Sequence, residues 1–367
     1  MKSAVLTANE GEPSDDYQTD PDGSISIVDF SDPANPVVST ADFTDYNGEE
    51  DALRSQGVRI YGPDASASQD LEPEYIAVSA DGATAWVTLQ ENNALAIIDI
   101  ATASVTDIVT LGETDRSIAG NGIDASDDDE VIDIKTFAGV VGLYLPDSIH
   151  GYTVNGKTYL VTANEGDARA WGEDNDAYWG EEADEDAVPP VACMPDASQG
   201  FVEEFRVKHL VHNSGFARRC GDDLPPQLSE LADGALLDPA VFGYCGAEAG
   251  DSGDCREDDV LGRLNITWTL GYKTNADGSP KMYDDAGAED AVAGDRIMYD
   301  TLYSYGGRSF SIRDESGDLV FDSGDAIEQF LASDDCKLGS DRSIDCADYF
   351  NTGHDEGDAM DSRSDAK

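Results

Sequence analysis

Basic residues are scarce in this sequence. Its 367 residues include 22 Lys and Arg against 77 Asp and Glu, which gives a formal net charge of −55 at pH 7. A surface this negative repels the phosphates of nucleic acids and anionic lipids, so we expect neither as a partner. The excess fits a halophilic protein, in which carboxylates keep the surface hydrated and salt screens their repulsion, with calcium binding as a contributor.

Long hydrophobic runs are also missing. No stretch of about eighteen apolar residues occurs, so we expect no segment of this chain to insert into a membrane. The opening residues 1–3 lead into an apolar run at 4–7 that is too short for a secretion signal and predicts a strand. The polar C-terminal stretch lacks a closing strand, and we therefore expect a fragment of a longer exported protein.

The common catalytic motifs are absent as well. The sequence has no GxSxG, HExxH, GxxxxGK[ST] or GxGxxG pattern, and its four histidines lie in dissimilar contexts. None of its six cysteines belongs to a CxxC pair, so we do not expect a zinc site. The sequence therefore predicts neither a side-chain nucleophile nor a histidine-based metal centre.

The cysteines suit disulfide bonds formed in an oxidising compartment. Two pairs are each separated by ten residues, which favours two local bridges and leaves the other two cysteines to each other: Cys245 with Cys255, Cys336 with Cys346, and Cys193 with Cys220. Six cysteines allow 15 pairings, so other connectivities stay open. Disulfides of this kind predict an extracellular or cell-surface location.

The clearest structural pattern lies in residues 70–111. Runs rich in β-branched and aromatic residues at 75–78, 85–89 and 94–100 are separated by the turn signals Ser79-Ala80-Asp81-Gly82 and Gln90-Glu91-Asn92-Asn93. A fourth run at 103–111 would complete a four-stranded antiparallel sheet. One such sheet cannot bury its apolar faces alone, but several sheets arranged around an axis can. We predict an all-β fold, a β-propeller with four-stranded blades of the YVTN or WD40 kind, incomplete in this chain.

Composition divides the rest of the chain. Blade-like patterns fill residues 1–170 and return at 261–330, and a hairpin is expected over Asn155-Gly156. Residues 171–260 are acidic, rich in cysteine and poorly patterned, which predicts a long insertion held by disulfides. Residues 331–367 read as a polar, acidic loop or tail.

One five-residue segment occurs twice. Thr7-Ala8-Asn9-Glu10-Gly11 is repeated identically at 162–166, which is 155 positions later, and each copy follows an apolar strand. Both copies therefore place an Asn-Glu pair at the same end of equivalent strands. Glu10 and Glu165 are expected to lie at one mouth of the propeller.

A second group of acids precedes the strand at 75–78. Asp70, Glu72 and Glu74 alternate with other residues, and alternate residues of an extended chain point to the same side. Acids that converge repel each other unless a cation binds or their pKa values shift, and Ca²⁺ prefers oxygen ligands of this type. Alternatively, these are ordinary acids in a chain where one residue in five is acidic. The predicted metal ligands are Glu10, Asp70, Glu72, Glu74, Glu165 and Asp167.

Arg308 is one of the few cations, in the segment Gly306-Gly307-Arg308-Ser309-Phe310-Ser311. In so negative a chain it needs a partner. A structural salt bridge to an acid at a strand end is one interpretation, and binding of a substrate phosphate or carboxylate is the other.

Several segments together resemble the choice-of-anchor I family of exported bacterial and archaeal proteins, catalogued beside a mesenchyme-specific cell surface glycoprotein. They include ANEGEPSDDY, SISIVDFSD, DLEPEYIAVSADG, VTLQENNALAIIDI and LVTANEGDAR. The resemblance implies a seven-bladed propeller on or outside the cell, with further blades at both ends and a variable C-terminal anchor. Family members are often labelled alkaline phosphatase or phytase-like, although no phosphatase nucleophile is visible here.

We therefore predict an exported, calcium-binding β-propeller that serves as a cell-surface or extracellular-matrix interaction module. Its partners would be surface or matrix components, or further copies of itself. One alternative is a metal-dependent phosphoester hydrolase, in which bound calcium and a water act without a side-chain nucleophile. Another is a structural subunit of an extracellular assembly, joined through free strand edges.

Overall fold

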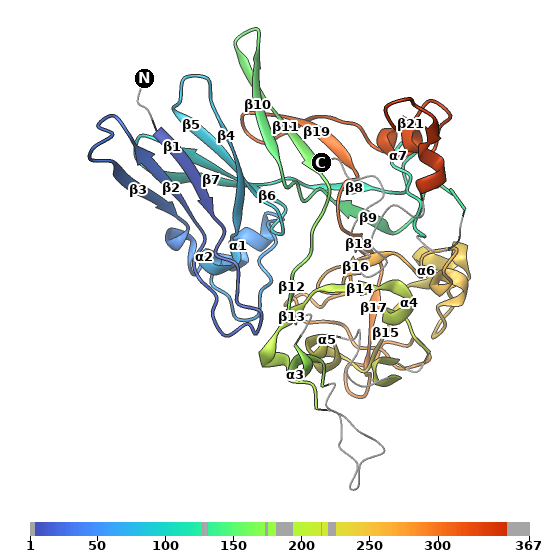
Figure 1. Cartoon of the computed structure of the whole chain (residues 1–367). Coiled ribbons are helices and arrows are strands. Elements are labelled where there is room, and N and C mark those ends of the chain that lie inside the picture. The colour runs from blue at the N-terminus through green and yellow to red at the C-terminus, as the bar shows by residue number, and fades with distance from the viewer. Residues whose placement is uncertain are drawn as a thin grey trace.

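A computed structural model describes residues 4–126, 129, 131–172, 175–180, 194–213, 215–218 and 225–350. Most of its regular structure is β-strand. Three antiparallel sheets fill the upper part of Figure 1, and a long excursion of the chain lies below them.

The first two sheets are built from consecutive strands. The first contains β1 (Ala4–Asn9), β2 (Ser24–Asp29) and β3 (Val37–Asp42). The second contains β4 (Pro73–Val78), β5 (Thr84–Leu89), β6 (Ala94–Asp99) and β7 (Ser104–Thr110). The turn between β4 and β5 has Gly82 at φ 73°, a left-handed conformation that glycine adopts without strain. The four-stranded antiparallel sheet predicted for residues 70–111 is confirmed.

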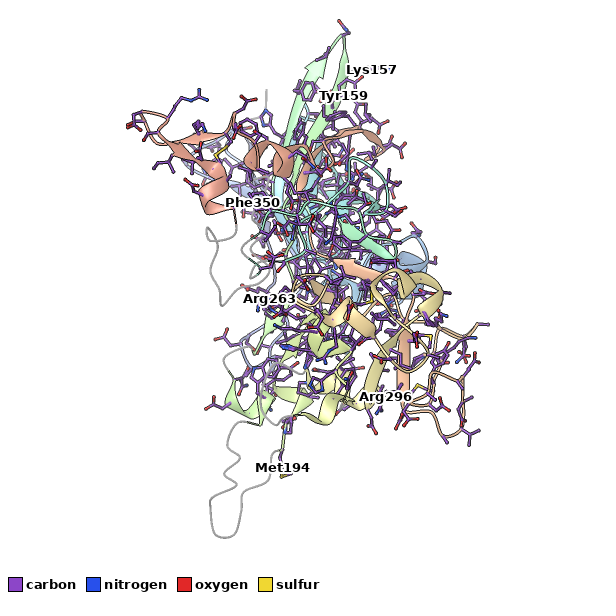
Figure 2. The ribbon with its side chains drawn as sticks, turned by 90° about the vertical axis from the view of Figure 1, so that its right-hand side faces the viewer. Lys157, Tyr159, Met194, Arg263, Arg296 and Phe350 are labelled. Carbon is purple, nitrogen blue, oxygen red and sulfur yellow. A yellow bond between two sulfur atoms is a disulfide. The ribbon has the colours of Figure 1, made fainter. Side chains whose placement is uncertain are left out.

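The third sheet is assembled from two distant parts of the chain. Its order is β10 (Ile149–Val154), β11 (Lys157–Asn164), β19 (Ser309–Asp314) and β20 (Leu319–Asp322). The predicted turn at Asn155-Gly156 has both residues at positive φ, 53° and 78°, as a type I′ hairpin requires. Figure 2 shows this hairpin, with Lys157 and Tyr159, standing out from the body. Residues 165–308 therefore form one long excursion from a single sheet.

The excursion contributes to a five-stranded mixed sheet and to two small sheets. The mixed sheet has the order β14 (Glu204–Arg206), β16 (Asn265–Thr267), β18 (Leu302–Ser304), β9 (Val140–Leu143) and β8 (Glu113–Asp115), with β18 and β9 parallel. The small sheets pair β12 (Ala170–Trp171) with β13 (Phe201–Val202) and β15 (Gly234–Leu237) with β17 (Arg296–Tyr299). A hairpin of β21 (Lys337–Leu338) and β22 (Ile344–Asp345) follows the third sheet. Within the described residues, the sheets do not close into a propeller ring.

All the helices of the described residues are short. The α-helices are α1 (Glu50–Ser55), α2 (Ala67–Asp70), α3 (Asp176–Trp179), α4 (Val207–Leu210), α5 (Pro226–Leu231), α6 (Pro239–Phe242) and α7 (Ala326–Leu331). None of the described helices is long and apolar enough to cross a bilayer.

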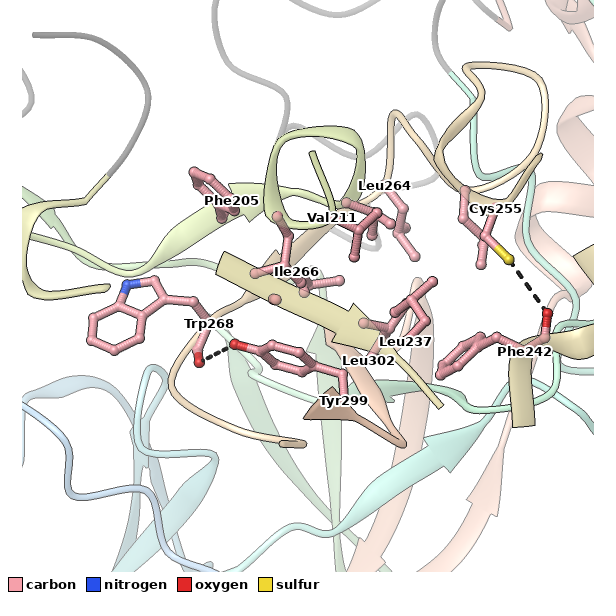
Figure 3. Packing of buried hydrophobic residues seen from close by; sticks show 14 of the residues in the cluster. Phe205, Val211, Leu237, Phe242, Cys255, Leu264, Ile266, Trp268, Tyr299 and Leu302 are labelled. Atoms are coloured by element: carbon pink, nitrogen blue, oxygen red, sulfur yellow. Dashed lines mark hydrogen bonds between the residues drawn. The ribbon is translucent and has the colours of Figure 1, made fainter. Parts of the chain in front are cut away.

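Separate apolar cores hold these parts together. Ile25 of the first sheet packs in one core with Val87 of the second, and Trp86 on the opposite face of β5 packs in another with Leu160 of the third. The excursion packs in a third core, shared with Phe137 and Val140, in which Ile266 and Tyr299 are fully buried (Figure 3). The Tyr299 hydroxyl donates to the Trp268 carbonyl at 2.8 Å, so this buried polar group is satisfied. The excursion is therefore a packed body and not a loose loop.

Candidate functional site

A cavity of about 640 Å³ lies where the three sheets and the excursion meet. Its wall is formed by residues that follow β1, β5 and β11, by the starts of β4 and β10, and by β12 and β14. No Lys or Arg of the described chain lines it. The carboxylates that do are Glu10, Glu12, Glu74, Glu91, Asp147, Glu165, Asp167 and Glu204.

Three of these glutamates occupy equivalent positions in the three sheets. Glu10 directly follows β1, and Glu165 directly follows β11 in the repeated segment. Glu91 follows β5 in the related stretch Val87-Thr88-Leu89-Gln90-Glu91. Each sheet thus delivers one glutamate from the same end of an equivalent strand. Glu91 was not among the predicted ligands, although the shared pattern Thr-x-Asn/Gln-Glu points to it.

Side-chain hydrogen bonds support the equivalence of the first and third sheets. The Asn9 amide donates to the hydroxyls of Ser24 and Ser26 on β2, at 3.2 and 2.9 Å. The Asn164 amide makes the same pair of bonds to two serines of β19, at 3.0 and 2.7 Å: Ser309 and Ser311. In both copies of the repeat, the same pair of Asn–Ser hydrogen bonds fixes the end of the strand just before the glutamate.

A second repeated element brings two more acids to the cavity. Pro73-Glu74 and Pro146-Asp147 each stand where the first strand of a sheet starts, β4 in one case and β10 in the other. Proline fixes its own backbone φ angle, which restricts the path of the chain just before each acid. Both acids line the cavity. The cavity is therefore a product of the repeated sheet and not of one irregular loop.

The pKa of Glu74 is strongly raised. Burial and the negative charges of Glu91 and Glu10 raise its pKa to about 11, with smaller contributions from Asp147 and Asp167. The side-chain amide of Gln90, oriented to satisfy its neighbours, donates to both Glu74 carboxylate oxygens at 2.8 and 3.0 Å. The raised pKa favours the protonated form of Glu74 at neutral pH, whereas the Gln90 donor favours the carboxylate.

One carboxylate oxygen of Glu91 lacks a hydrogen-bond partner. Only 4% of it is exposed, and its Oε2 atom has no hydrogen-bond partner among the described residues. Burial raises its pKa, against the opposing effect of the nearby Arg169 guanidinium. An oxygen that is buried, unpartnered and located at a cavity wall is a costly arrangement unless a ligand completes it.

Asp70 and Glu72 do not line the cavity, in contrast to the expectation that they share one side with Glu74. Asp70 ends α2, so the chain is not extended there. Both carboxylates instead pair with Arg169, whose Nη1 lies 2.7 Å from Asp70 Oδ1 and whose Nη2 lies 3.2 Å from Glu72 Oε2. An arginine that is distant in the sequence and buried in the fold thus offsets these two charges.

Arg169 belongs to a buried polar layer behind the cavity. The ring of Tyr61 lies between two guanidinium groups, 4.0 Å from Arg59 and 4.6 Å from Arg169. Arg59 pairs with Glu203, which also accepts a hydrogen bond from the Tyr61 hydroxyl at 2.7 Å. The layer joins the excursion to the sheets and fixes the wall on which Glu91 lies.

The other predicted residues are placed elsewhere. Arg308 lies outside the cavity lining: its Nη1 donates to the Asp124 carbonyl at 3.0 Å and pairs with Glu328 at 3.4 Å. The predicted disulfides Cys245–Cys255 and Cys336–Cys346 are present. Cys193 and Cys220 lie outside the described residues.

The structure thus brings four of the six predicted ligands to one cavity: Glu10, Glu74, Glu165 and Asp167. In the described part of the chain, no three His, Cys, Asp or Glu side chains form a ready-made metal site. Ca²⁺ accepts six to eight oxygen ligands, several of which can be water. A cavity of this volume is large enough for a hydrated ion.

The fold and the cavity define an acidic, disulfide-bonded, mostly β domain. The chain belongs to the choice-of-anchor I family, because the model of the choice-of-anchor I domain matches residues 2–210 and 254–367. The unmatched residues 211–253 fall in the excursion. Family membership and the disulfides together indicate an extracellular or cell-surface location.

Other comparisons add little to this assignment. No curated protein matches the chain. Among solved structures it is similar to a chain of Kuenenia stuttgartiensis hydrazine synthase at 18% identity, over 43% of each chain, with a TM-score of 0.16. A likeness at that TM-score carries no information about a shared fold or activity.

Proposed function

We propose that this chain is a surface-associated domain that binds a divalent cation, Ca²⁺ or a similar hard ion, in the acidic cavity, and that the loaded domain serves as a cell-surface or matrix interaction module. The observation that carries the proposal is the repeated delivery of carboxylates to one cavity: Glu10, Glu91 and Glu165 from equivalent strand ends, with Glu74 and Asp147 opposite. The family resemblance implies that the sheets around them are blades of a propeller, and this identification is part of the proposal.

Electrostatics supports an ion over an empty cavity. Eight carboxylates in one cavity with no basic side chain on its wall repel each other strongly. The metal-free protein relieves this repulsion by keeping Glu74 protonated, and the Glu91 Oε2 atom is left without a partner. A hard divalent cation would relieve both, because carboxylate and water oxygens are its preferred ligands.

A second candidate function is metal-dependent phosphoester hydrolysis. One observation bears on it: Trp171 belongs to the cavity lining, and its buried indole N–H has no acceptor among the described residues. This donor would reach an oxygen of an anionic substrate held on the ion if the side chain turned toward the cavity. In this mechanism a bound ion activates a water, and no protein nucleophile is needed.

Calcium titration of the metal-stripped chain tests the main proposal. Isothermal titration calorimetry at constant high salt should show saturable Ca²⁺ binding, and Glu74→Gln and Glu91→Gln should each weaken it at least tenfold. The matched control is Glu230→Gln, which removes an exposed acid on α5. Absence of binding, or equal binding by all variants, would refute the proposal.

Phosphate release from a generic phosphate monoester separates the two candidates. Turnover that chelator and Glu74→Gln both abolish would assign the hydrolase. Calcium binding without turnover would assign the interaction module.

A further inference from the structure

The acidic cavity has more room than one ion takes up. Its volume is about 640 Å³, and pockets that hold small organic molecules measure about 300–1,000 Å³. A Ca²⁺ ion with a full shell of eight waters occupies about 240 Å³, since the share of one water in the liquid is about 30 Å³. The space beside the ion is therefore large enough for an organic ligand.

Hydrogen-bond acceptors dominate the wall of the cavity. When ionised, its eight carboxylates accept hydrogen bonds and donate none, and no Lys or Arg of the described chain lies among them. Glu91 is 4% exposed, and its Oε2 atom has no partner in the described part of the chain. A ligand that donates a hydrogen bond completes such a buried acceptor. The complementary ligand is therefore rich in donors and carries no negative charge, because a phosphate, sulfate or carboxylate group facing these acids would be repelled.

Two aromatic residues belong to the same wall. Tyr75 lies on β4 and Trp171 on β12, and both line the cavity. Tyr75 is 52% exposed, so the protein leaves much of its side chain uncovered. An aromatic side chain with a polar tip suits a ligand that has both apolar and polar faces. A sugar ring is such a ligand, because its C–H groups pack on an aromatic ring while its hydroxyls donate to acids at the edge.

We propose that the cavity, with its ion in place, binds a neutral saccharide. Two adjacent hydroxyl groups of the sugar would lie on the cation, whose preferred ligands are oxygens. Other hydroxyls would donate to carboxylates of the wall, Glu91 among them, and one face of the sugar would pack on Tyr75. This inference rests on the proposed function and names its partner: the surface or matrix component that the domain recognises is a glycan.

Charge and space together select a neutral sugar over an organic cation. An ammonium group would also satisfy the carboxylates, but it would compete for them with the ion of the proposed function. A neutral saccharide instead occupies the room that the ion leaves, and its hydroxyl oxygens replace waters of the ion's shell. The ion and the sugar therefore bind together, and the sugar requires the ion.

A glycan array tests the proposal with the full chain. Labelled protein is applied at about 1 M NaCl, where long-range repulsion is screened, to neutral, amino, uronic-acid and sulfated glycans, once with Ca²⁺ and once with EDTA. Neutral glycans should be bound with Ca²⁺, and EDTA should remove the signal. Binding confined to charged glycans, binding that EDTA leaves intact, or no binding would each overturn the proposal. Calorimetry on the same sample separates the two failures: if Ca²⁺ binds, only the glycan inference is lost, and if it does not, the proposed function is lost as well.

Tyr75→Ala tests the contact between the sugar and the aromatic ring. Fluorescence anisotropy is measured with the glycan that gives the strongest array signal, at a Ca²⁺ concentration that saturates each protein. Tyr75→Ala should bind about tenfold more weakly than wild type, whereas Tyr75→Phe, which retains the ring, should keep the wild-type affinity. The matched control is Tyr244→Ala, because Tyr244 is 50% exposed and lies outside the cavity lining. Unchanged affinity of Tyr75→Ala, or an equal loss in both alanine variants, would contradict the proposal.

Discussion

Glu74→Gln is the substitution whose effect the cavity predicts in most detail. Glutamine has nearly the shape of a protonated glutamate and cannot ionise. Because burial and the neighbouring acids raise the Glu74 pKa to about 11 in the fold, wild-type protein must take up a proton there when it folds at neutral pH. The variant takes up none, so we expect the metal-free variant to be the more stable of the two.

The sign and size of the effect follow from proton linkage. The unfolded glutamate titrates near 4.5, so below that pH both states are protonated and the two proteins should be equally stable. Above it, wild-type stability falls relative to the variant by up to about 1.4 kcal/mol per pH unit, until the folded pKa is reached. At pH 7 the difference should approach about 3 kcal/mol.

Calcium should offset most of this stability difference at pH 7. Binding the ion would ionise Glu74 and release its proton, so saturating Ca²⁺ at 100 times Kd should stabilise the wild type by about 2.7 kcal/mol. The variant should gain less. The measurement is urea unfolding of both proteins from pH 5 to pH 8, with EDTA and with Ca²⁺, at constant salt. Glu230→Gln, which removes an exposed acid, should show no such pH-dependent difference. A difference between Glu74→Gln and wild type that stays flat with pH would show that Glu74 ionises normally and would refute the reasoning.

Three further predictions concern the rest of the fold. Arg169→Met should lower the free energy of unfolding in urea by about 3–5 kcal/mol, because it leaves two buried carboxylates without their cationic partner. Arg54→Met, which breaks an exposed ion pair, should lower it by less than about 1 kcal/mol. Similar losses in the two variants would contradict the burial of the Arg169 pairs. Replacing Cys245 and Cys255 by serine together should lower the free energy of unfolding by about 2–4 kcal/mol, and an unchanged value would mean that this bridge does not constrain the excursion. The Tm measured by differential scanning fluorimetry should rise when the salt concentration is raised from about 0.1 M to about 1 M, because the Debye length falls from about 10 to about 3 Å. A Tm that falls with salt would contradict the repulsion expected from the net charge of −55.

Local patterns in the sequence predicted local structure well. The strand runs and the turn at Gly82 gave the second sheet with four strands, and Asn155-Gly156 gave the hairpin of the third. The two disulfides were predicted because each closes a ten-residue loop. The identical repeat also led to Glu10 and Glu165, which do line one cavity. In each case, neighbouring residues decide the outcome.

Long-range pairing could not be predicted in the same way. Asp70 and Glu72 turn away from the cavity because Arg169, about a hundred residues later, is buried beside them. Nothing near either acid in the sequence signals that partner. Glu91 was missed because its segment has diverged from the repeat, with Gln90 in place of asparagine and Leu89 in place of alanine. Its equivalence is apparent only from its place after β5.

The third sheet has a consequence for how the chain folds. β11 and β19 are neighbours in that sheet, yet 144 residues lie between Asn164 and Ser309. The second sheet is joined by short turns and can form early. β11 can pair with β19 only after the long intervening segment has brought the two strands together, and such long-range pairing slows folding. The entropy of closing a loop grows only slowly with its length, so the intervening body can lengthen or shorten at little thermodynamic cost. In agreement with this, the residues that the family model leaves unmatched, 211–253, lie in that body, whereas β11 and β19 lie in the matched ranges.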